Sequence, residues 1–244
     1  MSKLGQYILF LGVLFKNRES FATYFKLTID ECIYIGLNSI VIVSLVSVFM
    51  GAVSTVQTAY NLLSPLIPQT VIGLVVRDLT ILELAPTITA IVFAGKVGSS
   101  IAGNLGTMRI TEQIDALEVM GINSASYLVL PKIIATVFMY PFLVILAGVL
   151  AISGGLLASE MTGVVAPADF LTGLKTSFNE FGVVFAMIKS VVFGFLISSI
   201  AAFMGYYTKG GALEVGQSST QAVTVGCIAI LLSDFILAQL LLVR

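Results

Sequence analysis

Three ionisable residues lie inside long apolar stretches of the sequence: the acids Glu83 and Asp234 and the base Lys189. An unpaired acid in a hydrocarbon environment costs on the order of 2.5–3.5 kcal/mol, so each group needs a partner or a polar cavity. Lys189 can neutralise either acid, and three such groups can also relay protons. A structural ion pair, or side chains that reach a polar boundary, would explain the same residues without a functional role.

Other catalytic chemistry has no support in the sequence. There is no histidine, so no Ser-His-Asp or Cys-His constellation can form. Cys32 and Cys227 lie far apart in apolar segments, which predicts two buried thiols rather than a metal site or a disulfide. Gly95 and Lys96 are followed by Val97, and the phosphate-loop pattern is absent. We therefore expect that the chain is not an enzyme, binds no metal or cofactor and does not hydrolyse ATP by itself.

Small residues recur at spacings of three and four between residues 95 and 106. The glycines of this stretch are Gly95, Gly98, Gly103 and Gly106. Such spacing lets helix backbones approach closely, so it predicts helix packing. A cradle for a phosphate ligand is the weaker alternative, because no strand precedes the glycines.

A short amphipathic helix is predicted next, from Met108 to Gly121. One side of this helix carries the apolar residues Ile110, Ile114 and Leu117. The other side carries the acids Glu112, Asp115 and Glu118. The helix either lies at a membrane surface or binds a protein. Membrane headgroups are often anionic, so three exposed acids favour a protein partner.

The composition places these residues in an all-α polytopic membrane protein. Apolar residues make up 58% of the 244 residues and charged residues 10%, and no charge occurs between Glu31 and Arg77. Pro65 and Pro68 break that stretch into a hairpin. The net charge of -1 leaves no basic surface for nucleic acid. Five spans are predicted, near 33–56, 70–95, 129–157, 182–206 and 219–242.

The distribution of basic residues predicts the orientation. With the N-terminus in the cytoplasm, eight basic residues lie inside and three outside, and Lys189 lies within a span. The inside set is Lys3, Lys16, Arg18, Lys26, Lys96, Arg109, Lys132 and Lys209, and the outside set is Arg77, Lys175 and Arg244. Residues 1–30 mix these charges with aromatic and aliphatic residues, which predicts an interfacial elbow helix before the membrane domain, 31–244.

The stretch AGKVGSSIAGNLGTMRITEQIDAL, residues 94–117, resembles the MlaE/YrbE permeases. Further matching pieces are VMG at 119–121, YLVLPK at 127–132, IKSVVFG at 188–194, GYY at 205–207, GGA at 210–212, Gly216, TQAV at 220–223 and Asp234. The resemblance extends from about residue 30 to the end of the sequence.

The resemblance implies a homodimeric ABC-transporter permease in a bacterial inner membrane, with its C-terminus in the periplasm. Its partners would be cytoplasmic ATPase subunits, which use ATP and Mg²⁺, and a periplasmic MCE-domain protein, and its cargo would be phospholipid. The segment at about 107–121 would be the coupling helix that contacts the ATPase, through Thr111, Glu112, Gln113, Asp115, Leu117, Glu118 and Gly121. Two copies would enclose an apolar cavity around the second and fifth spans, with Glu83, Lys189 and Asp234 as its polar candidates.

One position departs from the family pattern. Where the family has Arg-Glu-Leu-Gly-Pro, this chain has Leu82, Glu83, Leu84, Ala85 and Pro86. Without the arginine, Glu83 either depends on Lys189 or is protonated. Two other functions stay open from the residues: an ion-coupled secondary transporter that uses Glu83, Lys189 and Asp234, and a membrane scaffold that transports nothing. Internal repeats with broken helices would favour the former, and no convincing repeat occurs.

Overall fold

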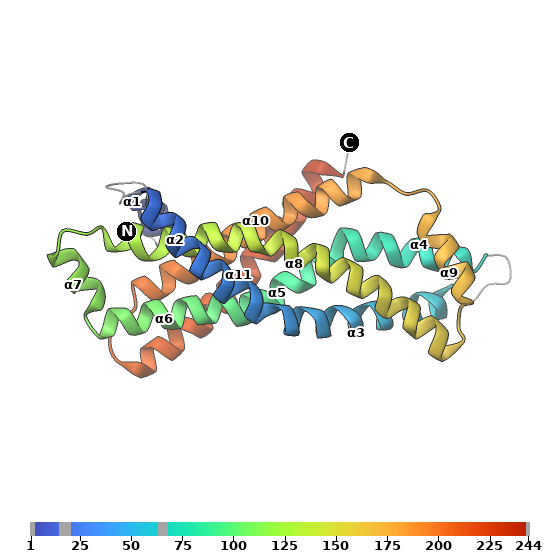
Figure 1. Cartoon of the computed structure of the whole chain (residues 1–244), viewed down its shortest axis with the longest axis horizontal. Helices are drawn as coiled ribbons and strands as arrows, with labels where there is room; N and C mark the ends of the chain where they lie inside the picture. Colours follow the sequence, from blue (N-terminus) through green and yellow to red (C-terminus); the bar gives the residue numbers. More distant parts are fainter. Residues whose placement is uncertain (1–2, 15–20, 63–67, 243–244) are drawn as a thin grey trace. The chain divides into compact units, whose positions relative to one another are not determined.

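The computed structural model describes residues 3–14, 21–62 and 68–242 (Figure 1), and helices are the only regular structure in these ranges. The all-α class predicted from the sequence is confirmed for them. Of the predicted proline turn, residues 63–67, which include Pro65, lie outside the described residues, whereas Pro68 is described. The chain divides into two compact units, both assembled from separated segments of the sequence.

Four helices in the described part of the chain are long and apolar enough to cross a membrane. They are Ala22–Asn61, Ser124–Thr162, Glu180–Tyr206 and Ala212–Leu241. Each overlaps a predicted span, at 33–56, 129–157, 182–206 and 219–242 respectively. Helices suit these segments because a bilayer offers no hydrogen-bond partner to an unpaired backbone group. The chain is thus a multi-pass membrane protein.

The predicted span at 70–95 has a more irregular helical structure. It contains α4 (Thr70–Leu79), the π-helix η2 (Thr80–Ile88), α5 (Thr89–Phe93) and the start of the π-helix η3 (Ala94–Gly98), which α6 (Ser99–Ile110) follows. Pro86 lies inside η2 and has no backbone N–H, which disturbs α-helical pairing in that turn. This segment is not among the four long apolar helices, and its crossing of the membrane stays a prediction.

Unit 1 consists of residues up to Ser39, Ala90–Tyr140 and residues from Val191 onward. Its helices are α1 (Lys3–Val13), α2 (Phe21–Cys32), η1 (Ile33–Leu37), α5, η3, α6, α7 (Gln113–Val119), the first part of α8 (Ser124–Thr162), the end of α10 (Glu180–Tyr206) and α11 (Ala212–Leu241). Helix α11 lies along η3 and α6 (Figure 1), so residues far apart in sequence meet there.

The predicted elbow region contains two helices rather than one. Helix α2 runs on through residue 30 into η1 and α3 without a break. Both helices contact the rest of unit 1: the Tyr7 hydroxyl lies 2.7 Å from Ser199 Oγ, and the Tyr24 hydroxyl lies 2.6 Å from Ser126 Oγ. Phe10 is buried against aromatic rings of α10. Residues 15–20, which include Lys16 and Arg18, lie outside the described residues.

Unit 2 consists of Ile40–Thr89 and Pro141–Ser190. It holds nearly all of α3 (Asn38–Asn61), together with α4, η2, the second part of α8, α9 (Pro167–Lys175) and the start of α10. Helices α4 and α9 lie side by side (Figure 1). An apolar cluster fills this region and comprises Ala59, Ile72, Val76, Val165 and Phe170. Helix α9 begins with Pro167 in its first turn, where a missing N–H costs no hydrogen bond.

Candidate functional site

Lys189 of α10 and Glu83 of η2 form an ion pair within unit 2. Lys189 Nζ lies 2.9 Å from Glu83 Oε1. The lysine side chain is completely buried, whereas the glutamate side chain is 40% exposed. Thr87 Oγ1 donates a hydrogen bond to the other carboxylate oxygen at 3.1 Å. Of the two acids that the sequence offered as partners for Lys189, the structure brings Glu83 to it.

The π-helix and its proline supply a second acceptor for the same ammonium group. Lys189 Nζ donates to the carbonyl oxygen of Leu82 at 2.9 Å. In an α-helix that carbonyl would accept the N–H four residues later, but position 86 is a proline and has none. Lys189 also lies 4.7 Å from the ring centroid of Phe185, one turn earlier in α10. A buried cation is thus held by a carboxylate, a carbonyl and an aromatic face.

Asp234, the other intramembrane acid, belongs to unit 1. It lies in α11 and is half-buried. The sequence grouped it with Glu83 and Lys189 because all three lie in apolar stretches. The structure pairs Glu83 with Lys189 in unit 2. Two of the three predicted residues therefore form an ion pair, and Asp234 belongs to the other unit.

The segment predicted as one amphipathic helix is divided in the structure. Helix α6 ends at Ile110, and α7 starts only at Gln113. The break lies at Thr111 and Glu112, because Glu112 adopts a left-handed conformation with φ 60° that cannot continue a helix. Gly121, with φ 80°, ends the segment on the other side.

The side-chain pattern of α7 separates apolar from acidic residues. Ile114 is buried and Leu117 is half-buried, whereas Glu112, Asp115 and Glu118 are exposed. The apolar stripe of α7 therefore packs against the rest of unit 1, and its acids point outward.

Two of the three exposed acids have partners within the chain. Asp115 pairs with Arg109 at 2.6 Å. Glu118 accepts hydrogen bonds from Ser124 Oγ at 2.8 Å and from the Tyr206 hydroxyl at 3.0 Å, which tie α7 to α8 and α10. Within the described residues, Glu112 has no ion pair or side-chain hydrogen bond. Of the three acids, Glu112 is therefore the one whose carboxylate is open to a partner.

The four glycines predicted to mediate helix packing differ from one another. A Cβ on Gly106 would lie 3.1 Å from Val215, and one on Gly103 would lie 3.3 Å from Ser219 Oγ, so both sit against α11. Gly98 has ordinary contact distances, and Gly95 has nothing within 4 Å. Close packing at this stretch therefore involves Gly103 and Gly106.

Comparison with known proteins shows the family. The family model described as "Permease MlaE" matches residues 28–240. The chain belongs to the MlaE permease family.

Two relatives of the chain are named as ABC-transporter permeases, and a third is named for a lipid. A "Probable ABC transporter permease protein" of Rickettsia bellii is 36% identical over 217 residues, which are 89% of this chain and 83% of the relative. Another, slr1045 of Synechocystis, is 38% identical over 88% of this chain and 81% of its own. "Protein TRIGALACTOSYLDIACYLGLYCEROL 1, chloroplastic" of Arabidopsis thaliana is 32% identical over 88% of this chain and 61% of its own. The chain is thus a membrane permease subunit of the ABC-transporter class.

Several residues that shape the two sites were missed in the sequence. Thr87, Phe185 and the Leu82 carbonyl complete the surroundings of the Glu83–Lys189 pair, and Ser124 and Tyr206 anchor Glu118. The signal for the carbonyl was available, because Pro86 follows Leu82 by four residues. The anchors of Glu118 come from helices that are distant in sequence, and no local pattern reveals them.

Proposed function

We propose that this MlaE permease forms the phospholipid-conducting membrane part of an ABC transporter and works as a homodimer. ATP and Mg²⁺ are used by partner ATPase subunits, and no cofactor is held by this chain. Membership of the ABC permease class is the observation that carries the proposal, and it favours ATP-driven over ion-coupled transport. The Glu83–Lys189 pair then shapes the permease, and no proton relay is needed.

A lipid cargo is supported by two features. One relative, from Arabidopsis, is named for a galactolipid. The long helices of the permease also carry exposed large apolar residues, including Phe49, Tyr60, Val149 and Phe235. Apolar surfaces of this kind can contact acyl chains without the cost of burying polar groups. We infer that the cargo is recognised mainly through its acyl chains.

The ATPase docks, in our proposal, on α7. Glu112 is exposed, carries no internal partner in the described residues and precedes the first turn of the helix. The residues at this surface are Thr111, Glu112, Gln113, Asp115, Leu117, Glu118 and Gly121. Because Glu118 is bonded to Tyr206, a movement of α7 is passed to the end of α10 through a direct contact. Nucleotide binding to the ATPases would drive that movement.

The proposed dimer involves α11, whose apolar window is covered least by the described chain among the four long helices. It exposes four large apolar side chains, those of Leu231, Leu232, Phe235 and Ile236. Asp234 lies between them in the sequence, and its side chain is half-buried. Two copies would use α11 and the segment at 70–95 to enclose the lipid cavity. The assembly would lie in a bacterial inner membrane and deliver lipid to, or receive it from, a periplasmic MCE-domain protein.

The test is a mild-detergent purification of the full chain from its native membrane, with proteins and lipids identified together by mass spectrometry. We expect a P-loop ATPase and phospholipid in the complex. Glu112→Lys should reduce the recovered ATPase at least several-fold, while Lys175→Glu, a charge reversal at an exposed residue of α9, should not. A folded sample that retains the ATPase in the Glu112→Lys variant would contradict docking on α7. One that carries neither ATPase nor phospholipid would contradict the proposed function.

A further inference from the structure

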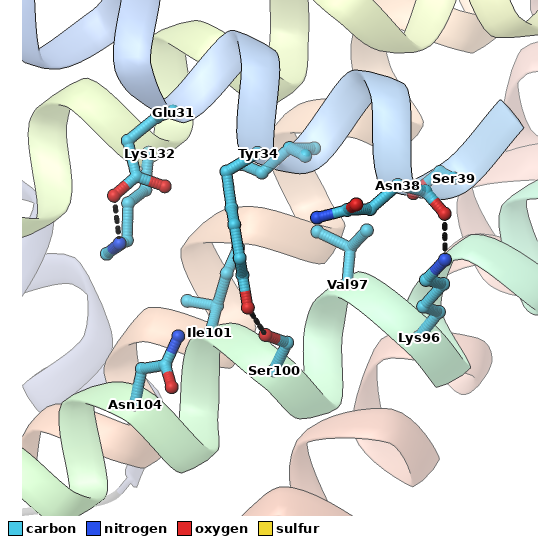
Figure 2. Close-up of a pocket in the computed structure, with 11 residues that line it drawn as sticks. Glu31, Tyr34, Asn38, Ser39, Lys96, Val97, Ser100, Ile101, Asn104 and Lys132 are labelled. Atoms are coloured by element: carbon cyan, nitrogen blue, oxygen red, sulfur yellow. Dashed lines mark hydrogen bonds and ion pairs between the residues drawn. The ribbon is translucent and has the colours of Figure 1, made fainter.

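A pocket of about 230 Å³, lined mainly by polar residues, lies within unit 1 (Figure 2). Residues from α2, η1, α3, η3, α6 and α8 line it. Figure 2 shows the Glu31–Lys132 ion pair at one end, the hydroxyls of Tyr34 and Ser100 in the middle, and Lys96 at the other end. The lining residues lie near ends of the predicted spans 33–56, 70–95 and 129–157, and the prediction places such ends at the depth of lipid headgroups.

Lys96 gives the pocket its excess charge. Its ammonium group donates a hydrogen bond to the carbonyl oxygen of Asn38, and it has no carboxylate partner among the described residues. Glu31 is already paired with Lys132. The lining therefore contains two cations and one anion, and its surplus positive charge favours an anionic ligand and opposes a metal cation.

A buried hydroxyl in the lining lacks a partner. Ser39 is 1% exposed, and its Oγ has no hydrogen-bond partner in the part of the chain that the structure describes. An unsatisfied buried hydroxyl costs on the order of 1–3 kcal/mol, so native proteins rarely keep one without a ligand or water to bond it.

The remaining lining atoms are suited to an oxygen-rich anion. The Tyr34 and Ser100 hydroxyls lie 3.3 Å apart, a long separation that leaves either free to turn toward a ligand. The side-chain amides of Asn38 and Asn104 add N–H donors to the lining. Phosphate oxygens accept several such hydrogen bonds at once, and an ammonium group strengthens them.

We propose that this pocket binds a phosphate group, with Lys96 and Ser39 as its principal donors. Its volume is below the roughly 300–1,000 Å³ of sites that enclose a whole drug-sized ligand. It therefore holds a headgroup or a free phosphate ion, with any acyl chains outside. The site is separate from the cargo cavity of the proposed function and would exist whether or not phospholipid is the cargo.

The experiment uses the purified full-length chain in a phosphate-free maltoside detergent. Three probes are titrated: phosphatidylglycerol, a phosphate-free glucosyl diacylglycerol, and inorganic phosphate. Native mass spectrometry counts the bound molecules, and thermal unfolding reports stabilisation. The variants are Lys96→Gln and Ser39→Ala, with Lys175→Gln as the matched control on the exposed end of α9.

We expect one site whose affinity for phosphatidylglycerol falls about tenfold in both pocket variants and stays unchanged in the control, while the glucolipid does not fill it. Competition by inorganic phosphate at similar concentration would identify a free phosphate as the ligand, and its absence would identify a headgroup. Equal binding of either phosphate probe by the wild type and both variants would overturn the proposal, as would failure of both phosphate probes to bind. Ser39→Ala removes only a hydroxyl, so it keeps the test valid if Lys96→Gln does not fold.

Discussion

Lys189 and Arg77 are the two buried cations of the described residues, and they are stabilised in different ways. Lys189 has the Glu83 carboxylate and one carbonyl. Arg77 pairs with its sequence neighbour Asp78 at 2.8 Å and also donates to three carbonyl oxygens, those of Leu174, Thr176 and Ser177, at 2.7 to 3.2 Å. A buried ion pair adds little net stability, but removing one member leaves the other charge without compensation. The two cations should therefore respond differently to substitution.

Glu83→Ala should destabilise the permease more than Lys189→Met. The former leaves a fully buried ammonium group with a carbonyl as its acceptor, whereas the latter leaves a carboxylate that is 40% exposed. We expect a loss of about 2–3 kcal/mol for Glu83→Ala, at the low end for a buried pair because of that exposure. The double variant should recover part of the loss. Thermal unfolding of the four proteins in one detergent measures this, and a double variant less stable than Glu83→Ala would contradict it.

Arg77→Met should loosen α9 without disturbing unit 1. The guanidinium group is 3% exposed and bonds three carbonyls at and beyond the C-terminus of α9, where helix carbonyls lack intrahelical partners. Methionine keeps much of the apolar bulk but leaves those carbonyls unsatisfied, at a cost of about 2 kcal/mol. Hydrogen exchange should increase in residues 167–180. Unchanged exchange there would show that other groups hold the helix.

At the scale of elements, close approach of backbones sets the helix packing of unit 2. Gly51 of α3 faces the backbone of Ala151, and Gly154 of α8 faces the backbone of Val48. The two helices thus cross with a glycine on each side of the contact, and a Cβ at either position would overlap a carbonyl oxygen. Small residues at such crossings let dispersion contacts stabilise helix association in lipid, where the hydrophobic effect does not.

Gly154→Ala should therefore be harmful and Gly95→Ala harmless. The added methyl at position 154 meets the Val48 carbonyl and forces α3 and α8 apart, at a cost of about 1–3 kcal/mol or more. At position 95 the methyl has nothing within 4 Å, and alanine favours the helix. The midpoint of thermal unfolding, compared under identical conditions, gives the difference. Equal midpoints for the two variants would contradict the crossing.

At the scale of the whole molecule, the distribution of charge predicts which end faces which compartment. The basic residues of the predicted inside segments include Lys96, Arg109 and Lys132, and the structure gathers Lys96 and Lys132 around one pocket of unit 1. The predicted orientation assigns both lysines to the cytoplasmic side of the membrane.

A labelling experiment in intact cells tests this orientation. After replacement of Cys32 and Cys227, Lys175→Cys should react with a membrane-impermeant maleimide from outside, because the loop at 158–180 is predicted to be periplasmic. Gln113→Cys should react only after lysis, because α7 is predicted to be cytoplasmic. Both positions are exposed, so access within the protein does not limit the reaction. The reverse pattern would invert the topology.

The sequence by itself determined the class of this protein and the place of its long helices. The sequence has too few polar residues to cover its long uncharged stretches in water, so these stretches predicted a helical membrane protein. Four long apolar helices overlap four of the predicted spans. The motif at 94–117 predicted the family that the comparison confirms. Periodicity also separated Ile114 from Glu112, Asp115 and Glu118, because burial on a helix follows its 3.6-residue repeat.

Only the tertiary structure decided which groups meet. Lys189 could have joined Glu83 or Asp234, since apolar context alone does not say which helices are neighbours, and the structure places Glu83 against it. The helix break at Glu112 depends on the left-handed backbone conformation of that one residue. Residues other than glycine rarely adopt this conformation, so the sequence gives no signal for the break. Gly51 and Gly154 were likewise not singled out, whereas Gly95 was, because spacing along one helix does not reveal where another backbone crosses it. Ion pairs, helix breaks and crossings are long-range or single-residue events, and local pattern carries little information about them.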